Sequence, residues 1–378
     1  MAGIYIHIPF CKTRCHYCDF YKSTDFGARN DFLSALKKEI IQRKDALNHA
    51  QIESIYFGGG TPSVLKVSEI ESILQVIRST FRLCPDPEIT LESNPDDMTA
   101  SFLHALTHTG VNRLSIGIQS FHDDELKLMN RRHDAAQARK CVQQALEAGF
   151  QNRNIDLIYG LPGQSLAKWK KNVEAAVDLG VSHISAYHLT YHEGTVFYDD
   201  LKSGKIREMT DELSISQFKW LRHQLMEAGY EPYEISNFAR QGWYSRHNRA
   251  YWEQKSYLGF GPSAHSFDQR TRRWNVASLG RYLEAVESGG VFWEEEVLSR
   301  QDQYNDYMIT SLRTIRGISR EYLDAVFGAP YACYFRQEAR PFIDAGYMLD
   351  DQGIYTLSEE GLFISDRIME KLLFTGPV

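Results

Sequence analysis

The stretch "IYIHIPFCKTRCHYCDF", Ile4 to Phe20, carries three cysteines within a short loop, directly after a strand-like apolar run. They are Cys11, Cys15 and Cys18. A disulfide framework needs an even number of cysteines, and a structural zinc site usually has four ligands. Three thiolates on a four-iron cube leave one iron without a protein ligand. On spacing alone zinc stays an alternative, with His7 or His16 as its fourth ligand.

Bulk composition describes a folded, soluble chain. The 378 residues are 43% hydrophobic and 24% charged, as is usual for globular proteins, and the length suits two domains. No apolar run approaches the roughly 18 residues that a membrane-spanning helix needs, and the N-terminus lacks the pattern of an export signal. The scattered Cys84, Cys141 and Cys333 do not form a secreted disulfide pattern and are expected to be buried small hydrophobes. These features predict a cytoplasmic protein without a transmembrane segment.

Strand-like runs alternate with amphipathic helical patterns between Ile4 and about Tyr191. The predicted strands cover 4–8, 54–57, 88–92, 113–118, 154–159 and 183–189. The predicted helices include 30–47, 68–81, 135–149 and 165–180. Strand followed by helix, repeated six times, predicts an α/β fold in which parallel strands curve into a partial (β/α)6 barrel covered by helices.

Most of the unusual polar or glycine-rich clusters follow a predicted strand. They are "CKTRCHYC" (11–18), "GGGTP" (58–62), "SNP" (93–95), "QSF" (119–121) and "GLPGQ" (160–164). In barrel-type α/β proteins the carboxyl ends of the strands form the functional face. We therefore expect the chemistry to gather at one mouth of the barrel.

The alternation stops after about residue 200, and the sequence predicts domains at 1–200, 201–290 and 291–378. A helix at 211–228 is followed by an irregular stretch at 230–275, rich in Tyr, Trp, His and Asn, and by two further helices. The end of the chain predicts a hairpin with its turn at 351–353 and a helix, as in winged-helix modules. The net charge of −7 and the pI near 6.0 argue against a nucleic-acid partner, so this mostly helical domain is expected to pack or to bind a protein.

The C-x3-C-x2-C spacing, with Tyr17 before the last cysteine, resembles the radical S-adenosylmethionine superfamily. The segments "YIHIPFC", "YFGGGTPS", "SIGIQSF" and "NIDLIYGLPGQS" resemble its HemN/HemW branch, which holds oxygen-independent coproporphyrinogen oxidase and a heme chaperone. The resemblance implies a 4Fe–4S cluster on Cys11, Cys15 and Cys18, whose open iron would chelate S-adenosylmethionine. It also implies that this ligand is contacted by Tyr5, Tyr17, Gly59, Gly60, Thr61, Glu92, Gln119, Arg131 and Asp156.

Three of these residues suit the ligand chemically. Glu92 and Asp156 each come near the end of a predicted strand, and their carboxylates can accept hydrogen bonds from ribose hydroxyls and the amino group. Arg131 offers a planar donor fork for a carboxylate.

Two departures separate this chain from the oxidase. The oxidase resembles C-x3-C-x2-C-x-C, whereas Phe20 stands at the last position here, and only ten residues precede Cys11, where the oxidase has an extension. The segment "RHNRAYW" resembles instead the H-N-x-x-Y-W motif of the chaperone, through His247, Asn248, Tyr251 and Trp252. Imidazole is a standard axial ligand of heme iron, and aromatic rings can stack on a porphyrin. His265, in "GPSAHSF", is a second candidate ligand.

The sequence therefore predicts a heme chaperone that transfers heme to acceptor hemoproteins. Respiratory acceptors would bring it to the membrane surface transiently. One rival is an oxidase that abstracts hydrogen from a propionate side chain, loses carbon dioxide and leaves a vinyl group. The other is a radical enzyme with a different substrate. Whether the chain is an enzyme is left open, and no catalytic residue is assigned.

Overall fold

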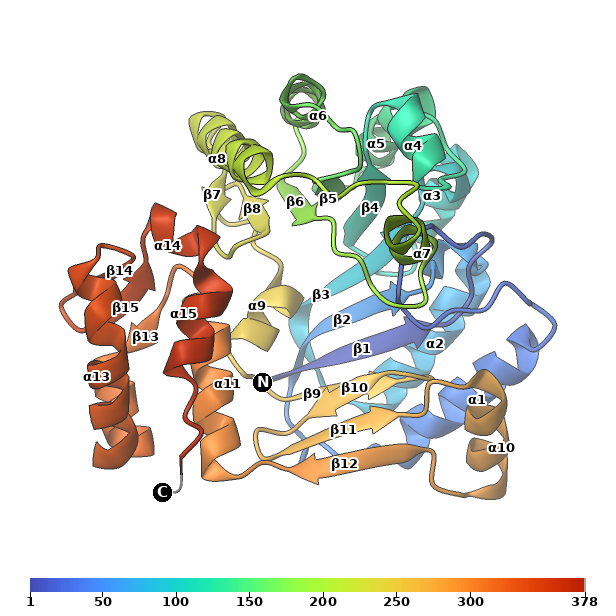
Figure 1. Cartoon of the computed structure of the whole chain (residues 1–378). Coiled ribbons are helices and arrows are strands. Elements are labelled where there is room, and N and C mark those ends of the chain that lie inside the picture. Colours follow the sequence, from blue (N-terminus) through green and yellow to red (C-terminus); the bar gives the residue numbers. More distant parts are fainter. Residues whose placement is uncertain (377–378) are drawn as a thin grey trace.

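Six parallel strands form the centre of the computed structural model, which describes residues 1–376 (Figure 1). They are β1 (Ala2–Ile8), β2 (Ile52–Gly59), β3 (Leu83–Ser93), β4 (Arg113–Gln119), β5 (Asn152–Tyr159) and β6 (His183–His188). Each strand pairs in parallel with the next one along the chain. The predicted partial barrel of parallel strands is confirmed.

Helices cover the outer face of these strands. They are α1 (Arg29–Gln42), α2 (Val67–Thr80), α3 (Ala100–Leu106), α4 (Asp123–Leu128), α5 (Ala135–Glu147) and α6 (Leu166–Asp178), with short turns η1 (Pro62–Val64) and η2 (Pro95–Asp97). In β1, Ile4, Ile6 and Ile8 are fully buried in the main apolar core. Because side chains alternate along a strand, Tyr5 and His7 point to the opposite, inner face.

Helix α1 ends at Gln42, five residues before its predicted end. The next residue, Arg43, donates from Nη1 to the Gly259 carbonyl at 2.7 Å and from Nη2 to Ser266 Oγ at 2.9 Å. These partners lie more than 200 residues away along the chain, so a sequence pattern could not show this end.

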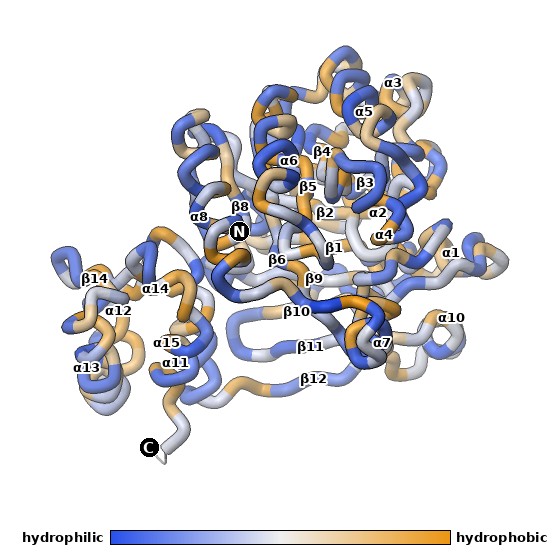
Figure 2. Tube along the Cα trace, turned by 45° about the horizontal axis from the view of Figure 1, so that its top comes forward, coloured by the Kyte–Doolittle hydropathy of each residue, from blue (hydrophilic) through white to orange (hydrophobic). Residues whose placement is uncertain are grey.

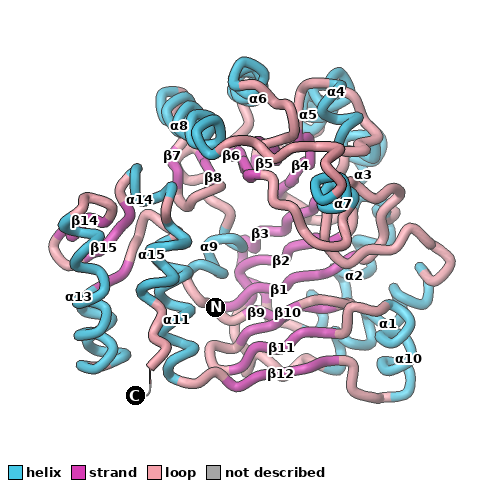
Figure 3. The backbone as a smooth tube through the Cα atoms, in the orientation of Figure 1, coloured by secondary structure: helices cyan, strands magenta, loops and turns pink. Residues whose placement is uncertain are grey.

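The sheet continues beyond both edges of the barrel, which corrects the expectation of an irregular stretch at 230–275. Next to β1 come β9 (Tyr257–Phe260), β10 (His265–Phe267), β11 (Thr271–Asn275) and β12 (Trp293–Val297), and next to β6 come β8 (Asn237–Ala239) and β7 (Glu231–Pro232). The whole sheet has twelve strands (Figure 3). These added strands are two to five residues long, too short for a clear alternation, and pairing with existing edges stabilises them.

Four further helices lie between these strands along the chain. They are α7 (Val196–Lys202), α8 (Asp211–Glu227), α9 (Arg246–Trp252) and α10 (Leu279–Ser288). Helix α9 packs against β1 and β2. The backbone amides of Arg246 and His247, in its first turn, donate to the carboxylate of Glu88 on β3. The helix therefore closes the barrel at the end opposite the carboxyl ends of the strands.

The C-terminal part has its own apolar cluster, separate from the barrel core. Its elements are α11 (Arg300–Leu312), β13 (Ile318–Ser319), α12 (Arg320–Tyr322), η3 (Leu323–Phe327), α13 (Ala329–Asp344), β14 (Met348–Asp351), β15 (Ile354–Leu357), α14 (Glu359–Phe363) and α15 (Ser365–Leu372). The predicted hairpin is present, with Gln352 and Gly353 at positive φ in its turn. The predicted domain limits stay a prediction, and 377–378 lie outside the described residues. Within residues 1–376 no helix is long and apolar enough to span a bilayer.

Candidate functional site

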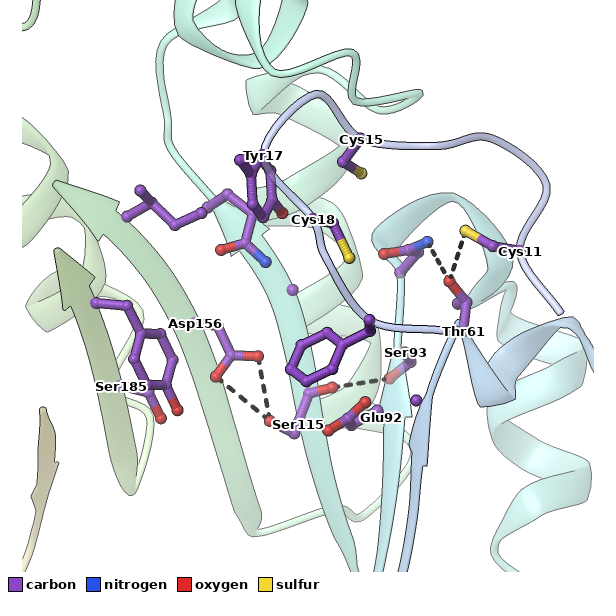
Figure 4. A pocket seen from close by; sticks show the side chains of 18 of the residues that line it. Cys11, Cys15, Tyr17, Cys18, Thr61, Glu92, Ser93, Ser115, Asp156 and Ser185 are labelled. Atoms are coloured by element: carbon purple, nitrogen blue, oxygen red, sulfur yellow. Dashed lines mark hydrogen bonds between the residues drawn. The ribbon is translucent and has the colours of Figure 1, made fainter. Parts of the chain in front are cut away.

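A cavity of about 460 Å³ opens among the carboxyl ends of the barrel strands and extends inward to α9 (Figure 4). The predicted site residues that line it are Cys11, Cys15, Tyr17, Cys18, Gly59, Gly60, Thr61, Glu92, Gln119, Arg131, Asp156 and Asn248. Tyr5, His247, Tyr251 and Trp252 are not among its lining residues. The structure thus brings together the residues predicted for a cluster and its ligand, except Tyr5, and places most of the heme motif elsewhere.

The cysteine loop is docked onto the segment that follows β2. The Gly60 amide donates to the Ile8 carbonyl at 2.8 Å, and the Thr61 amide donates to the Phe10 carbonyl at 2.9 Å. Lys12 pairs with Asp97 at 2.6 Å, which ties the far side of the loop to η2. The loop conformation is therefore set by backbone contacts with "GGGTP" as well as by its own sequence.

Two glycines permit this close approach. A Cβ atom on Gly60 would lie 2.5 Å from the Phe10 carbonyl oxygen, well inside contact distance with an atom of the backbone. Gly59 has a φ of +106°, and a Cβ there would meet the ring of His7 at 2.7 Å. A side chain at either position would push the two loops apart.

Arg131 is a positively charged residue that lines the cavity next to Cys15. Its Nη2 donates to Asn94 Oδ1 and to the Gly117 carbonyl, each at 2.6 Å, and its Nη1 lies 3.3 Å from Cys15 Sγ. Its Nε is buried and has no hydrogen-bond partner within residues 1–376. A buried donor without a partner is costly, so the guanidinium suits an acceptor such as a ligand carboxylate.

The three cysteines fit an iron–sulfur cluster better than a single ion. Within residues 1–376, no three His, Cys, Asp or Glu side chains lie close enough to hold one metal ion. A cube spreads its thiolates further apart, because each binds a different iron. The histidines considered for zinc are engaged, since His7 Nε2 is bonded to the Tyr21 carbonyl and His16 Nδ1 to the Leu128 carbonyl, both at 2.9 Å.

The scattered cysteines differ from one another. Cys141 is buried, as expected, but Cys84 is half-buried and Cys333 is exposed. The expectation of three buried thiols is therefore wrong for two of them. Cys333 lies on α13, whose core-facing positions are held by residues such as Phe335, so this thiol faces solvent.

The inner wall of the cavity carries two buried carboxyl groups. Burial raises the pKa of Glu92 to about 7, while the Tyr56 hydroxyl, which donates to Glu92 Oε1 at 2.7 Å, opposes that shift. Burial also raises the pKa of Asp156, against hydrogen bonds from Asn154 Nδ2 at 2.7 Å and from Ser115. Glu92 therefore titrates nearer to neutral pH than a free carboxyl group does, and the pKa of Asp156 is shifted upward by the same cause.

Several lining residues were missed by the sequence analysis. They are Tyr56, Asn94, Arg113, Ser115, Asn154, Ser185, Tyr187 and His188. Most sit two residues away from another lining residue on the same strand, as Ser115 does from Gly117 and Asn154 from Asp156. A period of two in polar residues inside otherwise apolar strands was the available signal.

His247 is buried between α9 and the barrel, with 2% of its surface exposed. Its Nδ1 is bonded to Ser54 Oγ at 2.9 Å and its Nε2 to the Tyr251 hydroxyl at 2.9 Å. Its ring also stacks on Tyr56, with the centroids 5.0 Å apart. Burial lowers the pKa of His247 to about 3, so the imidazole is neutral. Both ring nitrogens are engaged in this conformation.

The other residues of the heme motif face different directions. Asn248 lines the main cavity, whereas Trp252 lines a second cavity of about 170 Å³ on the outer side of α9, beside Tyr233, Tyr244 and Arg316. The Tyr5 ring lines neither cavity and is stacked with Tyr56 and His247. The motif does not form one pocket in this structure, and its role in heme binding stays a prediction.

Three comparisons place the chain among known proteins. The family model "Radical SAM superfamily" matches residues 5–185, and the model "HemN C-terminal domain" matches residues 298–364. The chain is 31% identical to "Heme chaperone HemW" of Bacillus subtilis, over 99% of both chains, and 36% identical to the protein of that name from Mycobacterium tuberculosis, over 75% of this chain and 74% of the relative. It is also similar to the solved structure of coproporphyrinogen III oxidase (HemN) from Escherichia coli, with a TM-score of 0.85 and 25% identity over 98% of this chain and 90% of that one.

Membership of this superfamily implies a 4Fe–4S cluster and S-adenosylmethionine, which agrees with the cysteine loop, the glycine cradle and the partnerless Arg131 Nε. The similarity to HemW of Bacillus subtilis identifies the family within the superfamily, because it spans the barrel, the added strands and the C-terminal part. The chain therefore belongs to the radical SAM superfamily and, within it, to the HemW family.

Proposed function

We propose that this chain is a cytoplasmic heme chaperone, which binds heme and transfers it to acceptor hemoproteins. The observation that carries the proposal is the similarity to the Bacillus subtilis heme chaperone HemW, which covers 99% of both chains. Acceptors of respiratory type would engage it at the membrane surface.

The proposed cofactor site uses the residues gathered at the barrel mouth. Cys11, Cys15 and Cys18 hold the 4Fe–4S cluster. When bound, the cluster supplies an electron for reductive chemistry on S-adenosylmethionine. The residues proposed to contact the latter are Tyr5, Tyr17, Gly59, Gly60, Thr61, Glu92, Gln119, Arg131 and Asp156.

The roles within this set follow from chemistry. Arg131 pairs with the ligand carboxylate through its planar fork, since its Nε has no partner within residues 1–376. Glu92 on β3 and Asp156 on β5, which both line the cavity, accept hydrogen bonds from ribose hydroxyls and the amino group. Gly59 and Gly60 let the backbone approach the ligand closely.

The proposed heme motif comprises His247, Asn248, Tyr251 and Trp252. Ligation by His247 requires that one of its two hydrogen bonds, to Ser54 or to Tyr251, break and that its ring become accessible. A displacement of the seven-residue helix α9 from β1 and β2 would break the Ser54 bond and expose the ring, and it would also separate the first turn from Glu88 of β3. Heme binding at this motif is therefore coupled to opening of α9.

The rival oxidase function is favoured by the structural match to HemN and disfavoured at one position. Phe20, where the oxidase pattern has a further cysteine, is 65% exposed and lines the mouth of the cavity. A phenyl ring there offers no ligand or thiol chemistry. The two HemW relatives named above match the sequence more closely than HemN does, at 31% and 36% against 25% identity.

Anaerobic purification tests the proposal. Iron, sulfide and heme are quantified on one sample, and transfer of bound heme to an apo-hemoprotein is followed by its absorbance. We expect a 4Fe–4S cluster, stoichiometric heme and transfer to the acceptor. With coproporphyrinogen III, S-adenosylmethionine and a reductant, no protoporphyrinogen should form. Sustained production of protoporphyrinogen, or a protein that binds no heme, would reject the chaperone function.

A further inference from the structure

The inner face of the barrel wall continues onto the added strands. Tyr5 on β1 pairs with Gly259 on β9, and Tyr257 two residues earlier pairs with Phe267 on β10. His265, two residues before Phe267, pairs with Trp274 on β11. Because paired residues and alternate residues share one face of a sheet, all of these face the same side as the barrel lumen.

This face is open beside β1. In Figure 1 no helix crosses in front of β9 to β12, while α1 passes behind their right-hand ends and α10 lies beside those ends. Figure 2 shows α7 near the same ends. The opposite face is covered, since Ser266 is buried there and bonded to Arg43 of the α1 end. We name the open area the β9–β12 face and define it by Tyr257, His265, Phe267, Arg272 and Trp274.

His265 differs from His247 in exposure and in hydrogen bonding. Its side chain is exposed, and its ring makes no hydrogen bond with any of residues 1–376. Its pKa is lowered, first by burial of part of the ring and then by the charge of Arg272, so the imidazole is neutral and keeps a free lone pair. A neutral imidazole nitrogen with a free lone pair is what an iron porphyrin binds.

The surroundings of His265 suit the rest of a heme molecule. The Trp274 indole lies nearly parallel to the imidazole, with the ring centroids 6.3 Å apart and an interplanar angle of 27°. Phe267 and Tyr257 continue the aromatic surface, with ring centroids 6.3 Å apart. Arg272 lies on the same face and bears the positive charge that heme propionates require, although it also pairs with Glu296 and Asp306.

An aromatic row joins this face to the buried histidine. Tyr257 contacts Tyr251 edge-on at 4.6 Å between centroids, and Tyr251 contacts His247 edge-on at 4.9 Å. The β9–β12 face thus ends at the helix that must open for His247 to be reached. A ligand bound on this face stands next to α9.

We propose that His265 is an axial heme ligand on the β9–β12 face, where Trp274 flanks the porphyrin, and that this outer site receives heme while α9 is closed. The proposal rests on the proposed heme chaperone function and adds a second ligand site to it. The protein then holds an accessible imidazole and a buried one at the two ends of one aromatic row.

Hemin titration of the full chain, purified anaerobically with its cluster, tests the site. His265→Ala should weaken hemin binding by roughly tenfold and change the Soret band, because the iron loses its imidazole. His265→Met should bind hemin with a shifted Soret band, because a thioether replaces the imidazole. Trp274→Leu should weaken binding with a smaller spectral change. His223→Ala is the matched control, an exposed histidine on α8 that should bind like the wild type.

Iron-free protoporphyrin IX separates ligation from apolar contact. It should bind equally to the wild type and to His265→Ala, and more weakly to Trp274→Leu. Cluster absorbance and circular dichroism verify that each variant is folded. If the wild type binds hemin and both His265 variants bind it with unchanged affinity and spectrum, the outer site is wrong while the chaperone function stands. If the wild type binds no hemin, both are wrong.

Discussion

The Nε2 atom of His247 lies 2.9 Å from the hydroxyl of Tyr251, one turn further along α9. With the Nδ1 bond to Ser54, this contact engages the whole imidazole inside the protein. Only the Ser54 bond joins the ring, and with it α9, to β2, because Tyr251 lies on the same helix as His247. Heme ligation through Nε2 would therefore compete with the Tyr251 hydroxyl, and opening of α9 would break the Ser54 bond.

Tyr251→Phe should shift that competition toward heme. The change leaves one buried nitrogen without a partner, which should lower the free energy of unfolding by about 1 to 3 kcal/mol, as measured by urea denaturation. If His247 is a ligand, hemin should also bind faster, because one bond fewer must break. Tyr347→Phe, on a more exposed ring, should change neither quantity. Lower stability with unchanged hemin kinetics would show that His247 is not a ligand.

Replacing any one of Cys11, Cys15 and Cys18 by alanine should abolish the iron–sulfur absorbance of the anaerobically reconstituted protein. Each substitution removes the thiolate that would bind one iron of the cluster. Cys333→Ala, at an exposed thiol on α13, is the control and should keep the full absorbance. Equal loss in the control, or zinc in place of iron on elemental analysis, would overturn the assignment.

Gly60→Ala should impair assembly of the cluster without touching a ligand. The new methyl group would meet the Phe10 carbonyl oxygen at 2.5 Å and the Ile8 carbonyl oxygen at 2.9 Å, so the cysteine loop must move away from the segment after β2. We expect iron content after reconstitution to fall well below that of the wild type. Gly280→Ala on α10 meets nothing within 4 Å and should leave iron content unchanged. Full loading of Gly60→Ala would mean that the loop is set by the cluster alone.

The barrel and its mouth could be predicted from the sequence because their signals are local. Alternation in "IYIHI" identifies β1, and its buried members Ile4, Ile6 and Ile8 pack outward. The polar clusters follow the strands directly, so the parallel arrangement alone brings Cys11 and Gln119 into one cavity. The barrel strands could be predicted without knowledge of contacts between residues far apart in the sequence.

The added strands and the placement of the heme motif could not be predicted, because tertiary contacts determine them. Strand β10 has three residues and is stabilised by pairing with its neighbours. "RHNRAYW" predicts a ligand through its residue types, yet the burial of His247 depends on Ser54, which lies 193 positions away. The exposure of His265 likewise follows from which sheet face the helices leave open.

Glu92→Gln should change how stability depends on pH. Burial raises the folded-state pKa of Glu92 from 4.5 to about 7, so between these values the native protein binds a proton that the unfolded chain has lost. The stability that this proton contributes is fully present below about pH 4.5 and is lost as the pH rises through 7, by roughly 3 kcal/mol in total. Glutamine does not titrate, so the variant should lack this decline.

Urea denaturation of the cofactor-free protein at pH 5 and pH 8 measures this effect. The wild type should lose more stability than Glu92→Gln between the two values, while the exposed control Asp124→Asn should follow the wild type. Because Asp124 has a lowered pKa, set chiefly by its bond with Lys168, its own contribution is already constant above pH 5. Parallel pH profiles for the wild type and Glu92→Gln would show that Glu92 is ionised in the folded protein at both pH values. The carboxyl would then meet a ribose hydroxyl as a charged acceptor at every working pH, and not as a group that titrates near neutrality.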